Sequence, residues 1–378
     1  MFKGNLNPTQ IITDLGLYFG IKIAVENTLI FFDEIQTVPE ALTSLKYFFE
    51  QMPELHLIAA NSLLGVCVGK SSSFPVGKVN LKTLYPLSFK EYLIANNEQL
   101  LVESLVKKEN FDAITSLIHE KLQNYLKRFL FLGGMPEVVQ NYLDKEDIAS
   151  ARAIQLEIVA AYQRDFSKYT NKNQIIKTAS VWDAIPYQLA KENKKFTYTT
   201  VKKNTRASYY EASIFWLKNA GLIHLAYNIS IPKLPLGGYA NNEKFKIYSL
   251  DTGLLGAMLG VSSAIITNPT QLFTEYNGAF IENFVATELI KSSTQKLFYW
   301  TSKSDAEVDF VLQIKDIIIP LEVKSGLSKN LKSIRSYASK YKPKFICRAS
   351  PRNFYQDNDF INIPLYALFI CKRLLGNN

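Results

Sequence analysis

The sequence is poor in the residues that build metal centres and disulfide frameworks. Its 378 residues include three cysteines and three histidines, and no two cysteines have C-x-x-C spacing. These residues are Cys67, Cys347, Cys371, His56, His119 and His224. Their scatter excludes a zinc ribbon or a disulfide scaffold as the organising feature. The sequence also lacks a signal-peptide core and any apolar run of about eighteen residues, so we expect a soluble cytoplasmic protein with no membrane partner.

A complete phosphate-binding loop is missing as well. The stretch "GVCVGKS", Gly65 to Ser71, has the pattern G-x-x-x-G-K-S. It is one residue shorter than the G-x-x-x-x-G-K-[ST] loop, whose backbone N–H groups surround a β-phosphate. Pro75 and Gly77 follow where such a loop should open into an amphipathic helix. We therefore do not interpret this stretch as a nucleotide loop.

The bulk composition is that of a folded protein with several domains. Hydrophobic residues make up 47% and charged residues 20%, and the length suffices for two or three domains with separate cores. The 43 Lys and Arg residues exceed the 34 Asp and Glu residues, which leaves a net charge of +9. This excess permits a polyanionic partner such as DNA, although it does not require one.

Residues 29–61 have the pattern of a strand, a helix and a second strand. The apolar runs 29–32 and 55–60 are short enough for parallel strands that are buried on both faces. Asp33 and Glu34 follow the first strand, and Asn61 follows the second. Carboxyl ends of parallel strands share one edge of a sheet, where an acidic pair can hold Mg²⁺ and polarise a water. The alternative is a helix N-terminus that carries acids, which the helix dipole favours.

Five blocks of the sequence follow one another in a characteristic order. They are "LIFFDEIQTVPEALTSLKYFFE", "LIAANSLLG", "FPVGKVNLKTLYPLSFKEYL", "FLGGMPEVV" and "AYQRDFSKYT". In this order they resemble bacterial and archaeal AAA-type ATPases that have a C-terminal domain like that of restriction endonucleases. The resemblance implies that Asp33 and Glu34 are the Walker B acids, with Asp33 at the Mg-ATP cofactor and Glu34 catalytic. It places Asn61 at the sensor position beside the nucleotide. Relatives carry their phosphate loop upstream of Walker B, and this sequence has none there, so we expect impaired ATP binding in a shortened family member.

The middle of the chain predicts helices followed by a winged helix. Residues 91–170 are helical in pattern, are interrupted at Gly133, and suit a lid. Ser208 and Glu211 form a capping-box pattern ahead of a helix that ends near Gly221. Residues 191–206 hold six basic residues and one acid. This basic segment indicates either DNA contact or a solvated face, and the charge pattern alone does not decide between them.

The segment "AEVDFVLQIKDIIIPLEVKSG" predicts a hairpin that turns at Lys315 and Asp316. With that turn, Asp309 lies opposite Glu322, and Lys324 shares the face of Glu322. Facing carboxylates repel each other unless a cation lies between them, and Mg²⁺ or Lys324 could supply it. Glu282 precedes these residues on a helix whose face also carries Val285, Ala286 and Leu289, so we expect it to point inward.

This order of residues is similar to the active-site pattern of the PD-(D/E)xK nucleases. The resemblance implies that Glu282, Asp309 and Glu322 are metal ligands for Mg²⁺ or Mn²⁺. It makes Lys324 a catalytic residue that steadies the hydroxide or the phosphate. The alternative is a surface hairpin in which Glu322 and Lys324 pair with neighbours.

The predicted fold is therefore α/β and multidomain. It comprises a partial P-loop ATPase parallel sheet (1–90), a helical lid (91–170), a winged helix (171–260) and a restriction-endonuclease-like α/β domain (261–378). The predicted function is that of an AAA-family ATP-binding protein of undefined cellular role that is associated with DNA. The alternatives are a silent interaction module and a metal-dependent DNA nuclease regulated by the ATPase part. A homo-oligomer or a protein partner is compatible with all three functions.

Overall fold

The computed structural model describes most of the chain as two compact units. The described residues are 1–61, 75, 77–169, 172–189, 196, 201, 209–262, 273–293, 296–302, 306–326 and 331–377. The N-terminal unit comprises residues 1–84 with 215–221, and the C-terminal unit comprises residues 85–214 with 222–378. Within the described ranges, no helix combines the length and apolar character needed to cross a bilayer.

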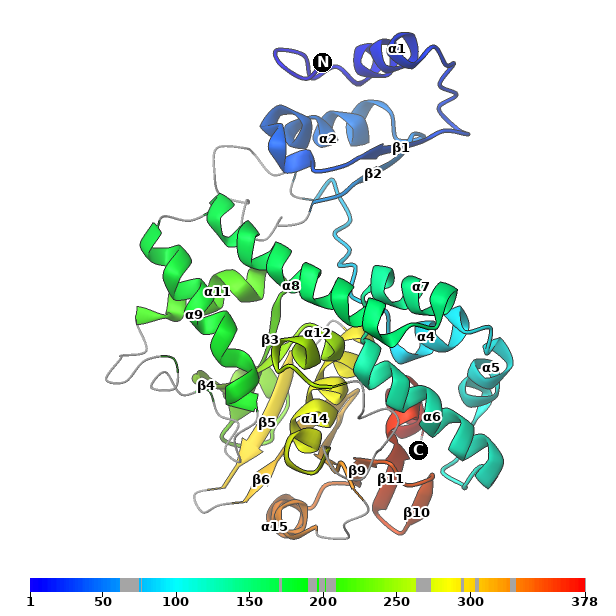
Figure 1. The fold of residues 1–378 in the computed structure, drawn as a ribbon, viewed down its shortest axis with the longest axis vertical. Coiled ribbons are helices and arrows are strands. Elements are labelled where there is room, and N and C mark those ends of the chain that lie inside the picture. The colour runs from blue at the N-terminus through cyan, green and yellow to red at the C-terminus, as the bar shows by residue number, and fades with distance from the viewer. Residues whose placement is uncertain are drawn as a thin grey trace. The chain divides into compact units, whose positions relative to one another are not determined.

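The N-terminal unit contains a parallel strand pair with helices on one face (Figure 1). Its elements are α1 (Pro8–Phe19), β1 (Leu29–Phe32), η1 (Ile35–Thr37), α2 (Pro39–Gln51) and β2 (His56–Ala59). Pro39 begins α2, where its fixed φ and missing N–H cost nothing. Ile30 and Phe32 pack against a core that includes Ile11 and Phe48. The predicted strand, helix and parallel strand are therefore confirmed.

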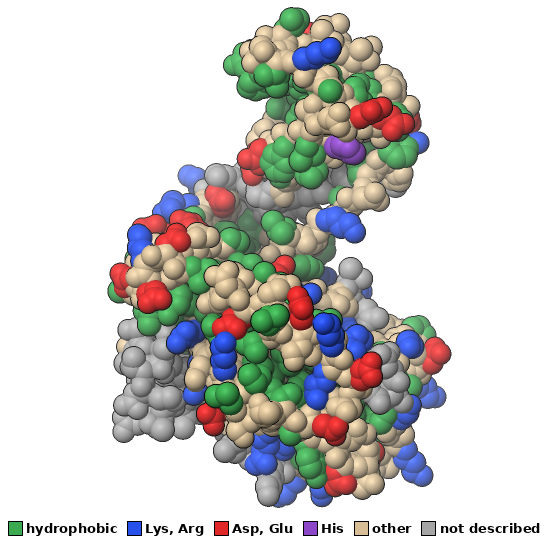
Figure 2. Space-filling model, turned by 90° about the vertical axis from the view of Figure 1, so that its right-hand side faces the viewer, with side chains coloured by type: hydrophobic (Ala, Val, Ile, Leu, Met, Phe, Trp, Pro, Cys, Tyr) green, Lys and Arg blue, Asp and Glu red, His purple; other side chains and the backbone are tan. Residues whose placement is uncertain are grey.

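The opposite face of this strand pair is exposed, so the expectation of strands buried on both faces was wrong. Leu29, Phe31 and Ile58 are 58%, 57% and 50% exposed. Among the described residues, β1 and β2 pair only with each other, and the helices cover only the side of Ile30 and Phe32. A short apolar run specifies a strand, but it does not specify whether another layer covers it. Figure 2 shows hydrophobic side chains on the visible surface of this unit.

The C-terminal unit begins with helices, as the sequence predicts for residues 91–170. They are α4 (Phe89–Ala95), α5 (Gln99–Lys107), α6 (Ser116–Leu132), α7 (Pro136–Lys145) and α8 (Ile148–Tyr169). The predicted interruption lies at Gly133, which ends α6 with a φ of 72°. These helices pack inside the same compact unit as α12 (Thr252–Met258) and α14 (Phe273–Lys291). The Phe129 and Phe284 rings, for example, lie 6.0 Å apart.

The region predicted as a winged helix contains helices and a strand pair. The described elements are α9 (Lys172–Leu189), α11 (Glu211–Asn219), β3 (Ile223–Ile229), η3 (Leu236–Tyr239) and β4 (Ala240–Ser249). Tyr210 and Ile214 are buried, which confirms the predicted inward face of α11. β3 pairs antiparallel with β4 and parallel with β5 (Leu297–Thr301). Ser208 and the lysines of the basic segment lie outside the described residues.

Two sheets complete the C-terminal unit (Figure 1). Their strand orders are β4-β3-β5-β6 and β10-β11-β9-β8-β7. The remaining elements are β6 (Glu307–Val308), β7 (Phe310–Ile314), β8 (Ile317–Val323), α15 (Lys332–Tyr341), β9 (Ile346–Ser350), β10 (Tyr355–Asp357), β11 (Phe360–Pro364), η4 (Leu365–Ala367) and α16 (Leu368–Asn377). In the β7–β8 hairpin Ile314 pairs with Ile317, and Phe310 pairs with Leu321. This is the predicted register, with Lys315 and Asp316 as the turn.

Candidate functional sites

The Walker B candidates and Asn61 lie at the same edge of the β1–β2 pair. The Ala60 N–H donates to the Phe32 carbonyl at 2.8 Å, and the Ile35 N–H donates to the Ala60 carbonyl at 3.2 Å. These bonds join the carboxyl ends of the two strands, where Asp33 and Glu34 follow β1 and Asn61 follows β2. Parallel pairing therefore brings the three residues to one edge, as the sequence predicts.

Local hydrogen bonds hold the two acids at this edge. Glu34 has a φ of 48°, and its N–H donates to Asp33 Oδ1 at 3.0 Å. The Gln36 amide donates to Glu34 Oε2, and the Thr37 hydroxyl donates to the Glu34 carbonyl. Both carboxylates are exposed, so solvent and a nucleotide can reach them. The roles of Asp33 and Glu34 as Walker B acids stay predictions.

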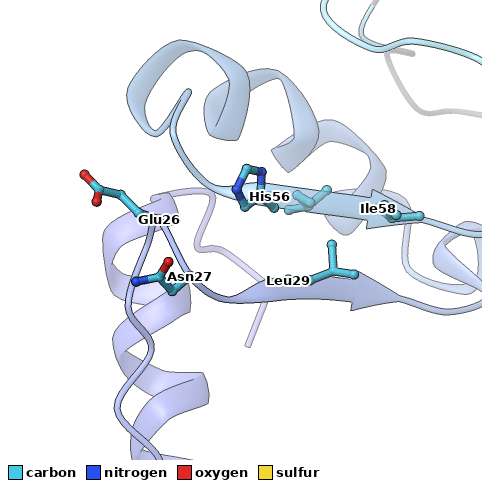
Figure 3. Close-up of a pocket in the computed structure, with 6 residues that line it drawn as sticks. Glu26, Asn27, Leu29, His56 and Ile58 are labelled. Carbon is cyan, nitrogen blue, oxygen red and sulfur yellow. The ribbon is translucent and has the colours of Figure 1, made fainter.

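An open hollow lies on the outer face of the same strands (Figure 3). It is lined by Glu26, Asn27, Leu29, His56, Leu57 and Ile58. Leu29 and His56 are the first residues of β1 and β2, so the hollow lies at the strand ends opposite to Asp33. Its lining is half aliphatic and half polar, and no predicted site residue contributes to it.

The second candidate site, in the C-terminal unit, is a cluster of carboxylates around Lys246. This lysine of β4 is 0% exposed. Its Nζ lies 2.6 Å from Glu307 Oε1, 3.0 Å from Glu282 Oε1 and 3.8 Å from Asp309 Oδ1. Burial by itself lowers the pKa of an ammonium, but these three carboxylates outweigh it, so the pKa of Lys246 is raised. The raised pKa keeps Lys246 protonated at neutral pH.

Two tyrosines support Lys246 and Glu282. Tyr248 follows Lys246 by two residues on β4, so both side chains project from the same face of the strand. The Tyr248 hydroxyl donates to Glu282 Oε1 at 2.7 Å. Burial and the Glu282 carboxylate raise the pKa of Tyr248 well above its ordinary value. The Tyr299 ring of β5 lies 5.1 Å from Lys246 Nζ. Glu282 is buried, which confirms that its helix face points inward.

The hairpin brings Asp309, Glu322 and Lys324 to this region. Asp309 Oδ2 accepts from the Val323 N–H at 2.8 Å, which ties it to β8 beside Glu322. Lys324 Nζ lies 2.6 Å from Glu322 Oε1. Glu322 is 6% exposed, and its Oε2 has no hydrogen-bond partner among the residues that the structure describes. Burial raises the pKa of Glu322, and Lys324 offsets part of that rise.

Four charged residues of this cluster were predicted from the sequence, and two were not. Glu282, Asp309, Glu322 and Lys324 were predicted, whereas Lys246 and Glu307 were not. Glu307 precedes Asp309 by two residues, so strand alternation could have placed both acids on one face. A lysine inside the apolar run "FKIYSL" was the signal for Lys246, because buried lysines need carboxylate partners.

The donor set fits a divalent cation in part. Asp309 and Glu322 are oxygen donors of the kind that Mg²⁺ and Mn²⁺ prefer, and the unpartnered Glu322 Oε2 is an open acceptor. Glu282 Oε1 is occupied instead by the Lys246 ammonium and the Tyr248 hydroxyl. Consistent with this, the part of the chain that the structure describes has no group of three or more His, Cys, Asp or Glu residues placed to hold a metal ion. The role of Glu282 as a metal ligand stays a prediction.

Three segments of the chain match families of known proteins. Residues 5–93 match an AAA domain. The N-terminal segment is therefore similar to the AAA domains of ATPases. Residues 123–264 match a domain of unknown function, DUF8612, and residues 277–368 match another, DUF4143.

Matches to whole proteins are more distant. Among solved structures, a Walker-type ATPase of Pyrococcus abyssi has 13% sequence identity and a TM-score of 0.37, covering 66% of this chain and 67% of that chain. This likeness is too weak to support an argument about the fold. No curated protein matches the chain.

Proposed function

We propose that the protein is an AAA-family ATP-binding protein that acts on DNA through its C-terminal unit. The observation that carries the ATP-binding part is the shared edge of Asp33, Glu34 and Asn61 within the segment that matches an AAA domain. At such an edge Asp33 would hold the Mg²⁺ of Mg-ATP, Glu34 would orient a water, and Asn61 would contact the γ-phosphate or that water.

Nucleotide binding is proposed to be weak in this chain. The sequence has no G-x-x-x-x-G-K-[ST] loop. Without that loop, no lysine and no backbone N–H groups surround the β- and γ-phosphates. The exposed carboxylates of Asp33 and Glu34 can bind a hydrated cation, but they repel the phosphates unless a cation lies between.

Isothermal titration with Mg-ATP tests this proposal. We expect binding too weak to give a micromolar dissociation constant, and any residual heat should disappear in Asp33→Ala. Glu26→Ala is the matched control, because this exposed acid precedes the amino end of β1 in the same unit. Micromolar binding that survives Asp33→Ala would mean that the edge at Asp33 is not the nucleotide site. Micromolar binding that Asp33→Ala abolishes would mean that another segment replaces the missing loop.

The DNA-related part of the proposal rests on the C-terminal cluster. The order Glu282, Asp309, Glu322, Lys324 resembles that of PD-(D/E)xK nucleases, and all four residues converge on one region of the unit. The order of elements α14, β5, β6–β7, β8, α15 and β9 is also compatible with a restriction-endonuclease-like core. The helix α11 followed by the β3–β4 pair is compatible with a winged helix. Figure 2 shows Lys and Arg side chains interspersed with Asp and Glu over the visible face of this unit.

A second candidate function is metal-dependent cleavage of DNA, and the open Glu322 Oε2 favours it. Asp309 and Glu322 would hold the ion. When bound, Mg²⁺ or Mn²⁺ lowers the pKa of a coordinated water and neutralises charge on the phosphate. The Lys324 ammonium, 2.6 Å from Glu322 Oε1, would donate to a phosphate oxygen or to the attacking water. The third possibility, a silent interaction module, would retain the cluster without binding either a metal ion or DNA.

A further inference from the structure

We propose that Lys246 is a resident cation that limits the C-terminal site to one divalent ion. Its ammonium takes the place at which Glu282, Glu307 and Asp309 would otherwise hold an ion of their own. The inference rests on the metal site proposed at Asp309 and Glu322, and it assigns a role to a residue outside the Glu, Asp, Glu-x-Lys pattern.

The contacts of Lys246 are those of a bound cation. Three carboxylate oxygens lie 2.6, 3.0 and 3.8 Å from Nζ, and they come from β6, from α14 and from Asp309, which lies between β6 and β7. The Tyr299 ring lies 5.1 Å away and adds a cation–π contact. Carboxylates drawn from separate elements around one centre are also how proteins bind Mg²⁺ and Mn²⁺. An ammonium that is held in this way excludes a second cation from the same place.

Within the described residues, the ion pairs of the cluster involve more carboxylates than ammonium groups. They join Glu282, Glu307, Asp309 and Glu322 to Lys246 and Lys324. This excess of acidic groups favours binding of a divalent cation. Glu322 Oε2, which is buried and has no hydrogen-bond partner among the described residues, marks the side of the cluster on which that ion would bind.

Asp309 lies between the position of the Lys246 ammonium and the proposed ion position at Glu322. Its Oδ1 faces Lys246 at 3.8 Å, and its Oδ2 is tied to the β8 backbone beside Glu322. Two-metal sites use a carboxylate of this kind between ions about 3.5–4 Å apart. Here the ammonium takes one of the two positions. Removing the Lys246 charge should therefore open the second position, because Glu282, Glu307 and Asp309 would lose the cation that they share.

Manganese titration of Lys246→Met tests the inference. Free Mn²⁺, followed by electron paramagnetic resonance, gives the number of ions bound per chain. We expect Lys246→Met to bind one ion more than the wild type, and Mn²⁺ to raise the melting temperature of the variant more than that of the wild type. Lys291→Met is the matched control, since Lys291 is also largely buried and pairs at 3.5 Å with the single acid Glu288. The control should gain no ion.

A charge-balanced variant keeps the test decisive if Lys246→Met does not fold. Lys246→Met with Glu307→Gln removes one positive and one negative charge, and Glu307 is the most exposed of the three acids around Lys246. We expect this double variant also to bind one ion more than the wild type, because the position left by the ammonium still faces the carboxylates of Glu282 and Asp309.

The outcomes separate this inference from the proposed function. Equal Mn²⁺ binding by the wild type and by whichever of the two variants folds would overturn the role of Lys246. A wild type that binds no ion, together with a variant that binds one, would support the role of Lys246 and would reject the proposed site at Asp309 and Glu322.

Discussion

Replacing Gly134 by alanine should destabilise the C-terminal unit, because this glycine lies directly against another segment of backbone. A Cβ atom at position 134 would lie 2.1 Å from the Leu87 carbonyl oxygen and 2.8 Å from the Leu87 nitrogen. Both atoms are main chain, so no side-chain rotation relieves the overlap. The Gly134 N–H also donates to Asp251 Oδ2 at 2.6 Å, and its carbonyl accepts from the Leu87 N–H at 2.7 Å.

The size of the effect follows from these contacts. Overpacking of a close contact costs roughly 1–3 kcal/mol. A hydrogen bond to a charged group contributes about 1.5–3 kcal/mol, and movement of Gly134 would weaken the one to Asp251. We therefore expect Gly134→Ala to lower the free energy of unfolding by about 3 kcal/mol, measured by urea denaturation with circular dichroism.

Gly278→Ala is the matched control for this experiment. Gly278 lies inside α14 in the same unit, and a Cβ atom there would meet no heavy atom within 4 Å. Alanine at such a helical position should be neutral or stabilising by up to about 1 kcal/mol. If Gly134→Ala also stayed within about 0.5 kcal/mol of the wild type, the close approach of Gly134 to Leu87 would be refuted.

Two further predictions concern acid stability and DNA cleavage. Burial, reinforced by Lys291, lowers the pKa of His224 to about 4, below its ordinary value of about 6.5. The unfolded chain then binds the proton more readily, so this histidine should lower the free energy of unfolding as the pH falls from about 6.5 to 4, by at most about 3 kcal/mol. The urea midpoints measured at these two pH values should differ less in His224→Gln than in the wild type. An equal difference in both proteins would contradict the lowered pKa of His224. If the second candidate function is correct, the protein with Mn²⁺ should nick supercoiled plasmid, and Asp309→Ala or Lys324→Ala should abolish nicking. A protein that binds Mn²⁺ but leaves single-stranded, linear and supercoiled DNA intact would exclude a nuclease.

The parts of this structure that sequence could predict are those fixed by local periodicity. The two-residue turn at Lys315 and Asp316 sets the register of the hairpin, and alternation along the strands then places Asp309 beside Glu322. Here a short stretch of chain carries all the information that the geometry needs. The burial of Glu282 was also predicted, but α14 is buried on every side from Ala279 to Leu289, so helical spacing alone does not explain it.

The parts that sequence could not predict depend on which elements become neighbours. Lys246 is surrounded by carboxylates from β6, from α14 and from Asp309, and no local pattern on β4 reveals them. The exposure of Leu29 and Phe31 on the outer face of β1 could not be predicted either, because their apolar side chains are equally typical of a buried strand. The helices of residues 91–170 were identified as helices, but their amphipathic pattern does not reveal that Phe129 packs against Phe284 of α14.

Metal-dependent binding of DNA is the measurement that tests the central claim most directly. The anisotropy of a fluorescent duplex would be followed with the full chain in Ca²⁺, which binds oxygen ligands, and again in EDTA. We predict that Ca²⁺ strengthens binding at least tenfold, and that Asp309→Asn and Glu322→Gln each lose this gain while Glu26→Ala keeps it. Equal binding in Ca²⁺ and EDTA, or no binding at low salt in either, would contradict the proposal that the C-terminal cluster acts on DNA through a divalent ion.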